Sequence, residues 1–458
     1  MAFQEIPALE AALAQNRDDM ITTLQRWVQQ PSVRAAAEAD APFGRDVRAM
    51  LDLALMDARR LGFTARDVDG YCMDFEVGEG MEPLAVLAHL DVVPEGEGWN
   101  DPPYGGVIRD GRMIGRGTSD DKGPAVAALF ALRSILDAGI PLRRPCRMIL
   151  GCDEESGMED LDYYDRAVGL PRQGFSPDAE FPMINTEKGI TQMTLRAPMG
   201  DRRLIELRSG TRVNIVPGKA TALLSGDLRA EVAEVFRPMS ESCEIEASLE
   251  EGNTRVVVTG TPAHGSTPDE GANAAKMLLS VLADLEIGGE ALTLLADTSC
   301  EENDGLGLGI AGRDAVSGPL TLNLGLLSLE DGMLCVAYDC RFPVLFDGEA
   351  IRATVARRLA PAGFALEADR LIQPHHVPES SELVSRLMDV YNGITGENAQ
   401  PFAIGGGTYA KHLQEGVAFG MLFPGEVATE HQANESIDLE NFVRAARIYA
   451  YAILAMCA

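Results

Sequence analysis

The sequence predicts an α/β fold, with a mixed, mostly parallel sheet covered by helices on both faces and an α+β domain inserted into it. Short, continuous apolar segments at 84–90 and 146–152 are typical of buried strands, and a helical stretch at 124–138 lies between them. After about residue 187 the pattern changes to alternating apolar and polar residues, as in antiparallel strands with one exposed face.

Three helices are expected in the first part of the chain. Apolar residues recur at helical spacing over residues 1–30, a segment that ends at Pro31, and again over 45–61, which stops at Gly62. The helix over 124–138 has a proline near its first turn and a glycine just past its end, which are favoured positions for these residues. Strand, helix and strand in this order indicate a parallel pair.

The inserted region has a different secondary-structure pattern from the first part of the chain. Segments such as TQMTLRA and TRVVVTG indicate antiparallel strands over 190–260, a helix is expected over 272–286, and strands return over 319–342. Helices are expected again over 381–395 and 440–456. We therefore predict a discontinuous catalytic domain and a lid domain, with these bounds: 1–186 and 379–458 for the catalytic domain, and 187–378 for the lid.

Composition excludes several classes of function. The chain has 458 residues, of which 46% are hydrophobic and 24% charged, and its formal net charge is −31. Such an acidic protein repels phosphate backbones and anionic lipids, so no nucleic-acid or membrane partner is expected. No signal peptide or membrane-spanning segment is visible, and the eight cysteines form no CxxC pair, which indicates reduced thiols and a cytoplasmic location.

Histidines and carboxylates follow the predicted buried elements. His89 ends a buried strand with Asp91 two residues on, which suits either a core histidine or a metal ligand oriented by a carboxylate. Asp120 and Asp121 precede a helix, where a simple helix cap and a functional role are equally consistent with the sequence. Other acidic or imidazole groups follow strands or lie in loops, namely Asp153, Glu154, Glu155, Asp178, His431 and Glu435.

The residue types indicate a hydrolytic metal site. Imidazole and carboxylate ligands without cysteine suit zinc, manganese or cobalt. Two imidazoles and three or four carboxylates exceed the needs of one zinc ion and fit a bridged pair about 3.5–4 Å apart. A carboxylate beyond the ligands can then serve as general base toward the attacking water.

Five motifs, in chain order HLDVVP, GRGTSDDKGP, DEESG, DAEFP and EHQANESI, resemble the M20 family of di-metal peptidases and deacylases. The likeness covers nearly the whole chain and is nearest to the PepV- and Sapep-type dipeptidases, which have a large lid. It implies that Glu154 is the general base, that Asp91 orients His89, and that the peptide bond before Asp121 is cis. The metal ligands it implies are His89 and Asp178 for one ion, Glu155 and His431 for the other, and Asp120 as the bridge.

The resemblance also extends to the lid. His264, in TPAHGSTPDEGANAA, matches a histidine that stabilises the oxyanion of the transition state, and Asn214 and Arg341 match positions that contact the substrate. The residues alone would indicate that His264 is a surface histidine. For Arg341 they fit a solvated arginine at a strand end as well as a substrate contact. The segment IGGGTYAK lacks the order of a phosphate-binding loop, and the family places it in the substrate pocket, through Gly406, Gly407 and Thr408.

We therefore expect hydrolysis of dipeptides or short peptides by a carboxylate-bridged di-metal centre. The cofactor would be two divalent ions per chain, with zinc expected and manganese or cobalt as alternatives. An N-acyl amino-acid deacylase of the acetylornithine or succinyl-diaminopimelate type shares every ligand, and a non-catalytic binding protein is the alternative of another class. The partner is a small peptide substrate. Because a large lid can replace a second subunit, a monomer is expected, with a dimer as the alternative.

Overall fold

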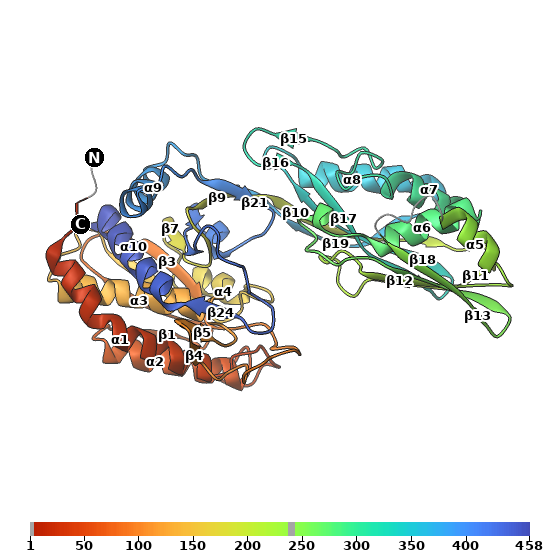
Figure 1. Ribbon diagram of the computed structural model, residues 1–458. Coiled ribbons are helices and arrows are strands. Elements are labelled where there is room, and N and C mark those ends of the chain that lie inside the picture. Colours follow the sequence, from red (N-terminus) through yellow and green to blue (C-terminus); the bar gives the residue numbers. More distant parts are fainter. Residues whose placement is uncertain (1–3, 237–242) are drawn as a thin grey trace. The chain divides into compact units, whose positions relative to one another are not determined.

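The computed structural model describes residues 4–236 and 243–458, and it divides the chain into two compact units (Figure 1). The first three residues of the helix predicted over 1–30, and residues 237–242 of the predicted strand region, lie outside the described residues. The first unit comprises Met1–Asn185, His376–Phe402 and Gly407–Ala458, and the second comprises Thr186–His375 and Ala403–Gly406.

The first unit is built on a mixed sheet. Its strand order is β1-β2-β6-β3-β7-β22-β9-β20, with β21 beside β9. The central strands β6, β3, β7 and β22 run parallel, and antiparallel strands flank them on each side. The strands are β1 (Arg66–Val68), β2 (Cys72–Val77), β3 (Leu84–His89), β6 (Cys146–Gly151), β7 (Gln173–Ser176), β9 (Ile184–Glu187), β20 (His375–His376), β21 (Phe402–Ile404) and β22 (Glu415–Ala418). The predicted mixed sheet is confirmed, and its parallel part is the set of four central strands.

Helices cover both faces of this sheet. Strand β3 is buried along its whole length, with Leu84, Val86 and Ala88 in the larger core and Ala85 and Leu87 in a smaller core on the other face. The larger core is formed with α1 (Pro7–Gln29), α2 (Arg45–Arg60), α3 (Lys122–Asp137), α9 (Glu382–Thr395) and α10 (Leu439–Cys457). The smaller core is covered by α4 (Glu159–Ala167) and the 3₁₀ helix η3 (Tyr409–His412). The helices predicted over 45–61, 124–138, 381–395 and 440–456 are confirmed.

Two small sheets carry loops of the first unit. One contains β4 (Val107–Arg109), β5 (Arg112–Ile114) and β24 (Ser436–Asp438), and so joins segments more than 300 residues apart in the chain. The other pairs β8 (Ala179–Glu180) with β23 (Met421–Leu422). The segment that ends at β24 and the segment that begins after β5 are therefore adjacent to each other where they meet the sheet.

The second unit is an eight-stranded antiparallel sheet with helices packed against it, which confirms the predicted α+β insertion (Figure 1). Its order is β13-β14-β12-β11-β17-β18-β10-β19. The strands are β10 (Gly189–Pro198), β11 (Leu204–Ser209), β12 (Lys219–Leu224), β13 (Glu244–Glu250), β14 (Asn253–Thr259), β17 (Thr321–Glu330), β18 (Met333–Phe342) and β19 (Ala365–Ile372). The helices are α5 (Arg229–Phe236), α6 (Ala274–Asp284), α7 (Gly289–Ser299) and α8 (Gly348–Leu359). A strand pair, β15 (Arg313–Asp314) with β16 (Gly318–Pro319), lies outside the main sheet.

None of the helices within residues 4–236 and 243–458 combines the length and the apolar composition needed to cross a membrane.

Candidate active site

The predicted site residues of the first unit gather at the carboxyl edge of its parallel strands. His89 is the last residue of β3, Glu154 and Glu155 lie in the turn after β6, and Asp178 follows β7. Because β3, β6 and β7 are parallel, their carboxyl ends meet at one edge, where open α/β sheets hold their sites. Asp120, in the loop before α3, and His431, in the loop before β24, complete the cluster.

Asp120 lies at the centre of the cluster, with one carboxylate oxygen toward each imidazole. Its Oδ1 is 3.0 Å from Nε2 of His89, and its Oδ2 is 2.9 Å from Nε2 of His431. Asp178 approaches the same His89 nitrogen at 3.6 Å, and Glu155 approaches the His431 nitrogen at 3.1 Å. Two groups of three residues have ligand atoms that all lie within 4.8 Å of one another. One group is His89, Glu154 and Asp178, and the other is His89, Asp120 and Glu155.

The carboxylates of this cluster are crowded and only slightly exposed, with 12% of the Asp120 side chain and 17% of the Asp178 side chain accessible to solvent. Burial raises the pKa of Glu154 above its ordinary value, and burial together with the Asp120 charge raises that of Asp178 to about 7. Burial opposes ionisation of Asp120 too, but hydrogen bonds with His431 and His89 hold the pKa of Asp120 below its ordinary value. The Asp120 and Glu155 carboxylates raise the pKa of His431 to about 11. Such a surplus of negative charge favours a bound cation.

Asp91 differs from the prediction in how it contacts His89. Nδ1 of His89 is 2.9 Å from the backbone carbonyl of Asp91 and 3.4 Å from its carboxylate, so the carbonyl makes the shorter contact. The Asp91 carboxylate accepts the backbone N–H groups of Glu154 and Glu155, each at 3.2 Å. One residue therefore orients the imidazole and also fixes the turn that carries the paired glutamates.

Asp121 does not cap the helix that it precedes. It is the N-cap residue of α3, but its side chain makes no capping hydrogen bond. Its Oδ2 accepts the backbone N–H of His89 at 2.9 Å. The peptide bond between Asp120 and Asp121 is cis, as the family resemblance implies. The adjacent acids thus have separate tasks, since one faces the imidazoles and the other holds the strand end.

Two acidic residues behind the site were not assigned a role from the sequence. Glu435 belongs to the EHQANESI segment, and its carboxylate accepts the backbone N–H of Asp120 at 3.2 Å. Asp160, at the start of α4, accepts the N–H of Asp153 at 2.9 Å and the hydroxyl of Tyr409, and so anchors the turn after β6. The role of Asp160 could not be predicted from neighbouring residues, because one of these partners is distant along the chain and the other belongs to a turn.

In the second unit, the predicted substrate-contacting residues lie close together. Nδ1 of His264 lies 2.6 Å from the Ser266 hydroxyl and 3.3 Å from the Ser266 backbone nitrogen, so this ring nitrogen is engaged within its own loop. The Asn214 carbonyl accepts the N–H of Gly265, the neighbour of His264, at 2.7 Å. Arg341 is 4% exposed, and it donates from Nε and Nη2 to Asp339 and from Nη1 to the Gly405 carbonyl. One N–H remains on each terminal nitrogen of Arg341 after these three bonds.

The glycine-rich segment spans the division between the units. Gly406 belongs to the second unit, whereas Gly407 and Thr408 belong to the first. Oγ1 of Thr408 accepts the N–H of Ala410 at the start of η3. The segment is therefore a crossing of the chain from one unit to the other, and not the beginning of a long helix as in a phosphate-binding loop.

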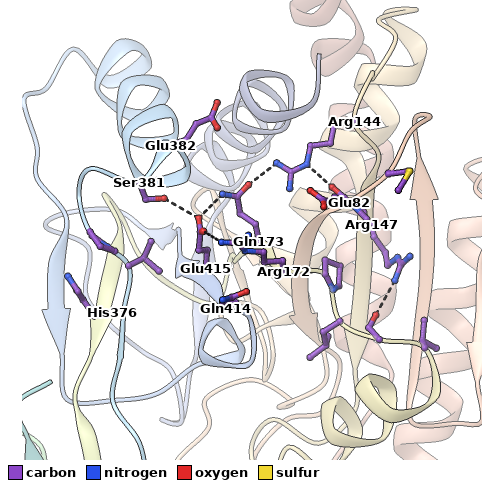
Figure 2. A pocket seen from close by; sticks show the side chains of 18 of the residues that line it. Glu82, Arg144, Arg147, Arg172, Gln173, His376, Ser381, Glu382, Gln414 and Glu415 are labelled. Atoms are coloured by element: carbon purple, nitrogen blue, oxygen red, sulfur yellow. Dashed lines mark hydrogen bonds and ion pairs between the residues drawn. The ribbon is translucent and has the colours of Figure 1, made fainter. Parts of the chain in front are cut away.

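A large hollow of about 1110 Å³ lies at the opposite, amino edge of the same sheet (Figure 2). Figure 2 shows Arg144 and Gln173 joined by a hydrogen bond, and Gln173, Arg172 and Ser381 gathered around Glu415. A smaller cavity of about 180 Å³ lies at the carboxyl edge, and Asp120 and Asp178 form part of its wall. Of these two cavities, the smaller one is lined by candidate ligands and the larger one is not.

Comparisons with known proteins identify the family of this chain. The model of peptidase family M20/M25/M40 matches residues 85–455. A Bacillus subtilis (strain 168) protein named "Putative dipeptidase YtjP" is 36% identical, and the match covers 97% of this chain and 98% of that protein. Human carnosine dipeptidase 1 has a similar fold, with a TM-score of 0.60 at 15% identity and 98% of each chain covered. The M20 family metallo-carboxypeptidase Sso-CP2 from Sulfolobus solfataricus gives a TM-score of 0.58 at 16% identity, over 95% of this chain and 98% of that one. The chain belongs to peptidase family M20/M25/M40.

Proposed function

We propose that this protein is a di-metal dipeptidase, which hydrolyses the peptide bond of dipeptides and short peptides. The observation that carries the proposal is the position of Asp120, whose two carboxylate oxygens face two different imidazoles at 3.0 and 2.9 Å. A carboxylate so placed can bridge two cations, each with one histidine. Family membership and the dipeptidase name of the 36% identical relative support the substrate class.

The residues present fit a pair of divalent ions. His89 and Asp178 would hold one ion, Glu155 and His431 the other, and Asp120 both. All donors are nitrogen or oxygen, as zinc, manganese and cobalt accept, and the buried carboxylates supply the negative charge that a pair of cations needs. When bound, such ions polarise a carbonyl group and increase the acidity of water. Loading would displace the proton that the high pKa of His431 retains at neutral pH.

Glu154 serves as general base in this proposal. Its turn is anchored through the Asp91 carboxylate, and its burial raises its pKa, so that its carboxylate accepts a proton more readily than an exposed glutamate does. Glu154 takes the proton of the attacking water and then delivers it to the leaving amine. The same side chain thus acts first as base and then as acid.

Residues of the second unit would bind the substrate. Nε2 of His264 would donate a hydrogen bond to the developing oxyanion, since Nδ1 is engaged by Ser266. The two remaining N–H groups of Arg341 can hold the terminal carboxylate of a peptide, while Asp339 and Gly405 fix its guanidinium. Asn214, Gly406, Gly407 and Thr408 are proposed to line the peptide.

Turnover of a mixed panel tests the proposal. Protein stripped with EDTA is resupplied with Zn²⁺, Mn²⁺ or Co²⁺ and offered dipeptides beside N-acetyl and N-succinyl amino acids. Metal-dependent cleavage of the dipeptides is expected. Cleavage of the acylated amino acids alone would keep the metal centre and replace the dipeptidase with a deacylase. A metal-loaded protein inert on the whole panel would indicate a binding protein.

A further inference from the structure

A fully buried ion pair lies directly behind the candidate metal site. Nη1 of Arg116 donates to Oε2 of Glu435 at 2.6 Å, and both side chains are essentially inaccessible to solvent. The two residues are 319 positions apart in the sequence, so the pair joins distant segments of the first unit. Burying two charges is costly unless each has further partners, and here each has several.

Glu435 holds the loop that presents Asp120. Its second oxygen, Oε1, accepts the backbone N–H of Ser119 at 2.9 Å, the Ser119 hydroxyl at 3.0 Å and the backbone N–H of Asp120 at 3.2 Å. The Glu435 carbonyl also accepts the N–H of Gly115 at 2.9 Å. Both carboxylate oxygens are therefore engaged by N–H and O–H donors and point to the loop.

Arg116 holds the segment that follows His89. Its Nη2 lies 3.3 Å from the carbonyls of Pro94 and Glu95, and its guanidinium lies 5.4 Å from the centre of the Trp99 ring. Asn434, next to Glu435, ties the same segment from the other side. It accepts the N–H of Asn100 at 2.8 Å and donates to the Gly98 carbonyl at 3.2 Å.

The His431 loop needs such an anchor. His431 and Asn434 both have a left-handed backbone, with φ of 61° and 64°, a conformation that costs free energy for residues other than glycine. The His431 side chain is 56% exposed, so packing does not fix it. His89, by contrast, is fully buried at the end of a regular strand, and Asp121 holds its backbone N–H.

We propose that Arg116 and Glu435 form a positioning pair that sets the distance between Asp120 and His431, and so controls the affinity of one of the two metal positions. The inference rests on the proposed di-metal site. The affected position is the one shared by Asp120, Glu155 and His431, because two of its three ligands stand on loops that the pair holds. The position at His89 and Asp178 is built on strand ends and depends on the pair only through Asp120.

Cobalt binding to the full-length protein tests the proposal. Metal-free wild type, Glu435→Gln and Arg116→Met are titrated with Co²⁺ by equilibrium dialysis, and the visible spectrum of bound Co²⁺ is recorded. Asp57→Asn is the matched control, since Asp57 is equally buried and bonds Arg26 and Trp27 away from the site. Wild type and control should bind two ions. Both site variants should keep one tight ion and bind the second 10–100-fold more weakly.

Three outcomes would overturn this inference or its premise. If Glu435→Gln binds both ions as tightly as the wild type, Glu435 has no positioning role. Loss of one ion in Glu435→Gln but not in Arg116→Met would make Glu435 itself a ligand. Fewer than two ions in wild type would refute the di-metal proposal, which separates that failure from the present one. Should Arg116→Met not fold, Arg116→Lys takes its place, and weakened second-ion binding is again the supporting result.

Discussion

The two edges of the sheet in the first unit differ in whether their charged side chains have partners of opposite charge. At the amino edge, in the hollow of Figure 2, Arg172 pairs with Glu415, and Arg144 donates to neutral oxygens of Gln173 and Glu82. At the carboxyl edge, Asp120, Glu154 and Asp178 lie close together, and burial with the charges of neighbouring carboxylates raises the pKa of Glu154 and Asp178. The hollow at the amino edge is about six times larger, at 1110 against 180 Å³.

This difference shows that volume is a poor guide to the site. Charges that are paired at a surface lower the free energy little and call for no ligand. Carboxylates that are buried side by side are unfavourable on their own, so a protein retains them where a bound cation or a reaction uses them. The chemistry is therefore expected at the smaller hollow, and the following substitutions test that assignment.

The largest effect is expected at Glu154. Glu154→Gln keeps the size of the side chain but removes the proton acceptor, so kcat should fall by about 10³. Metal content, measured by mass spectrometry, should stay at two ions per chain. Glu415→Gln, at the amino edge, is the matched control and should leave kcat unchanged. Loss of both ions in Glu154→Gln would show that Glu154 is a ligand instead of the base.

His264→Ala should have the next largest effect, although His264 lies in the second unit. Removing a donor to the oxyanion lowers kcat by about 10²–10³. Metal content and KM should change little, because the group acts on the transition state. Ser266→Ala, which removes only a hydroxyl beside Nδ1, should cost far less. An unchanged kcat in His264→Ala would exclude the oxyanion role.

Asp160→Asn should alter the pH dependence of stability. Burial raises the pKa of Asp160 to about 6 from an ordinary 3.8, so the folded protein binds more protons than the unfolded chain between these values. Stability from this group is therefore present at low pH and is lost as the pH rises from about 4 to about 6, by about 2–3 kcal/mol.

Thermal unfolding of the metal-free proteins between pH 4 and 7 measures this effect. The wild-type midpoint should fall relative to that of Asp160→Asn as the pH rises, and the gap should stay constant above about pH 6. Two midpoint curves that run parallel over the whole range would contradict a raised pKa at Asp160.

The smallest effect is expected at the amino edge. Arg144→Gln removes a cation that is held by neutral oxygens, so stability should change by about 0.5 kcal/mol or less and kcat/KM by less than about twofold. A tenfold loss of kcat/KM with normal stability would mean that the large hollow takes part in catalysis, and the contrast between the two edges would fail.

Much of the fold could be predicted because its signals are local. The apolar segment that became β3 and the periodic segment that became α3 are each visible within about fifteen residues. The short helix α4 was not predicted, since its nine residues give only two turns of periodicity. The chain's return to the second unit at residues 403–406 was not predicted either, because four residues carry no pattern.

The candidate ligands could be named from motifs, but their partners could not. Asp91 was expected to orient His89 through its carboxylate, and the carbonyl makes the shorter contact because the carboxylate faces the Glu154 turn. Asp160 bonds a tyrosine 249 positions away, and Glu435 bonds Arg116 across 319. Such pairings depend on the tertiary fold and leave no periodic trace in the sequence.

The path of the chain between the units has a consequence for engineering. The chain crosses from one unit to the other four times, since residues 403–406 belong with 186–375. Ile404 accepts the N–H of Lys188, and Gly405 accepts from Arg341, so this short piece is bonded into the second unit. A graft of 186–375 into a relative would therefore arrive without part of its own structure. Exchange of the second unit between relatives therefore requires both pieces to be transplanted together.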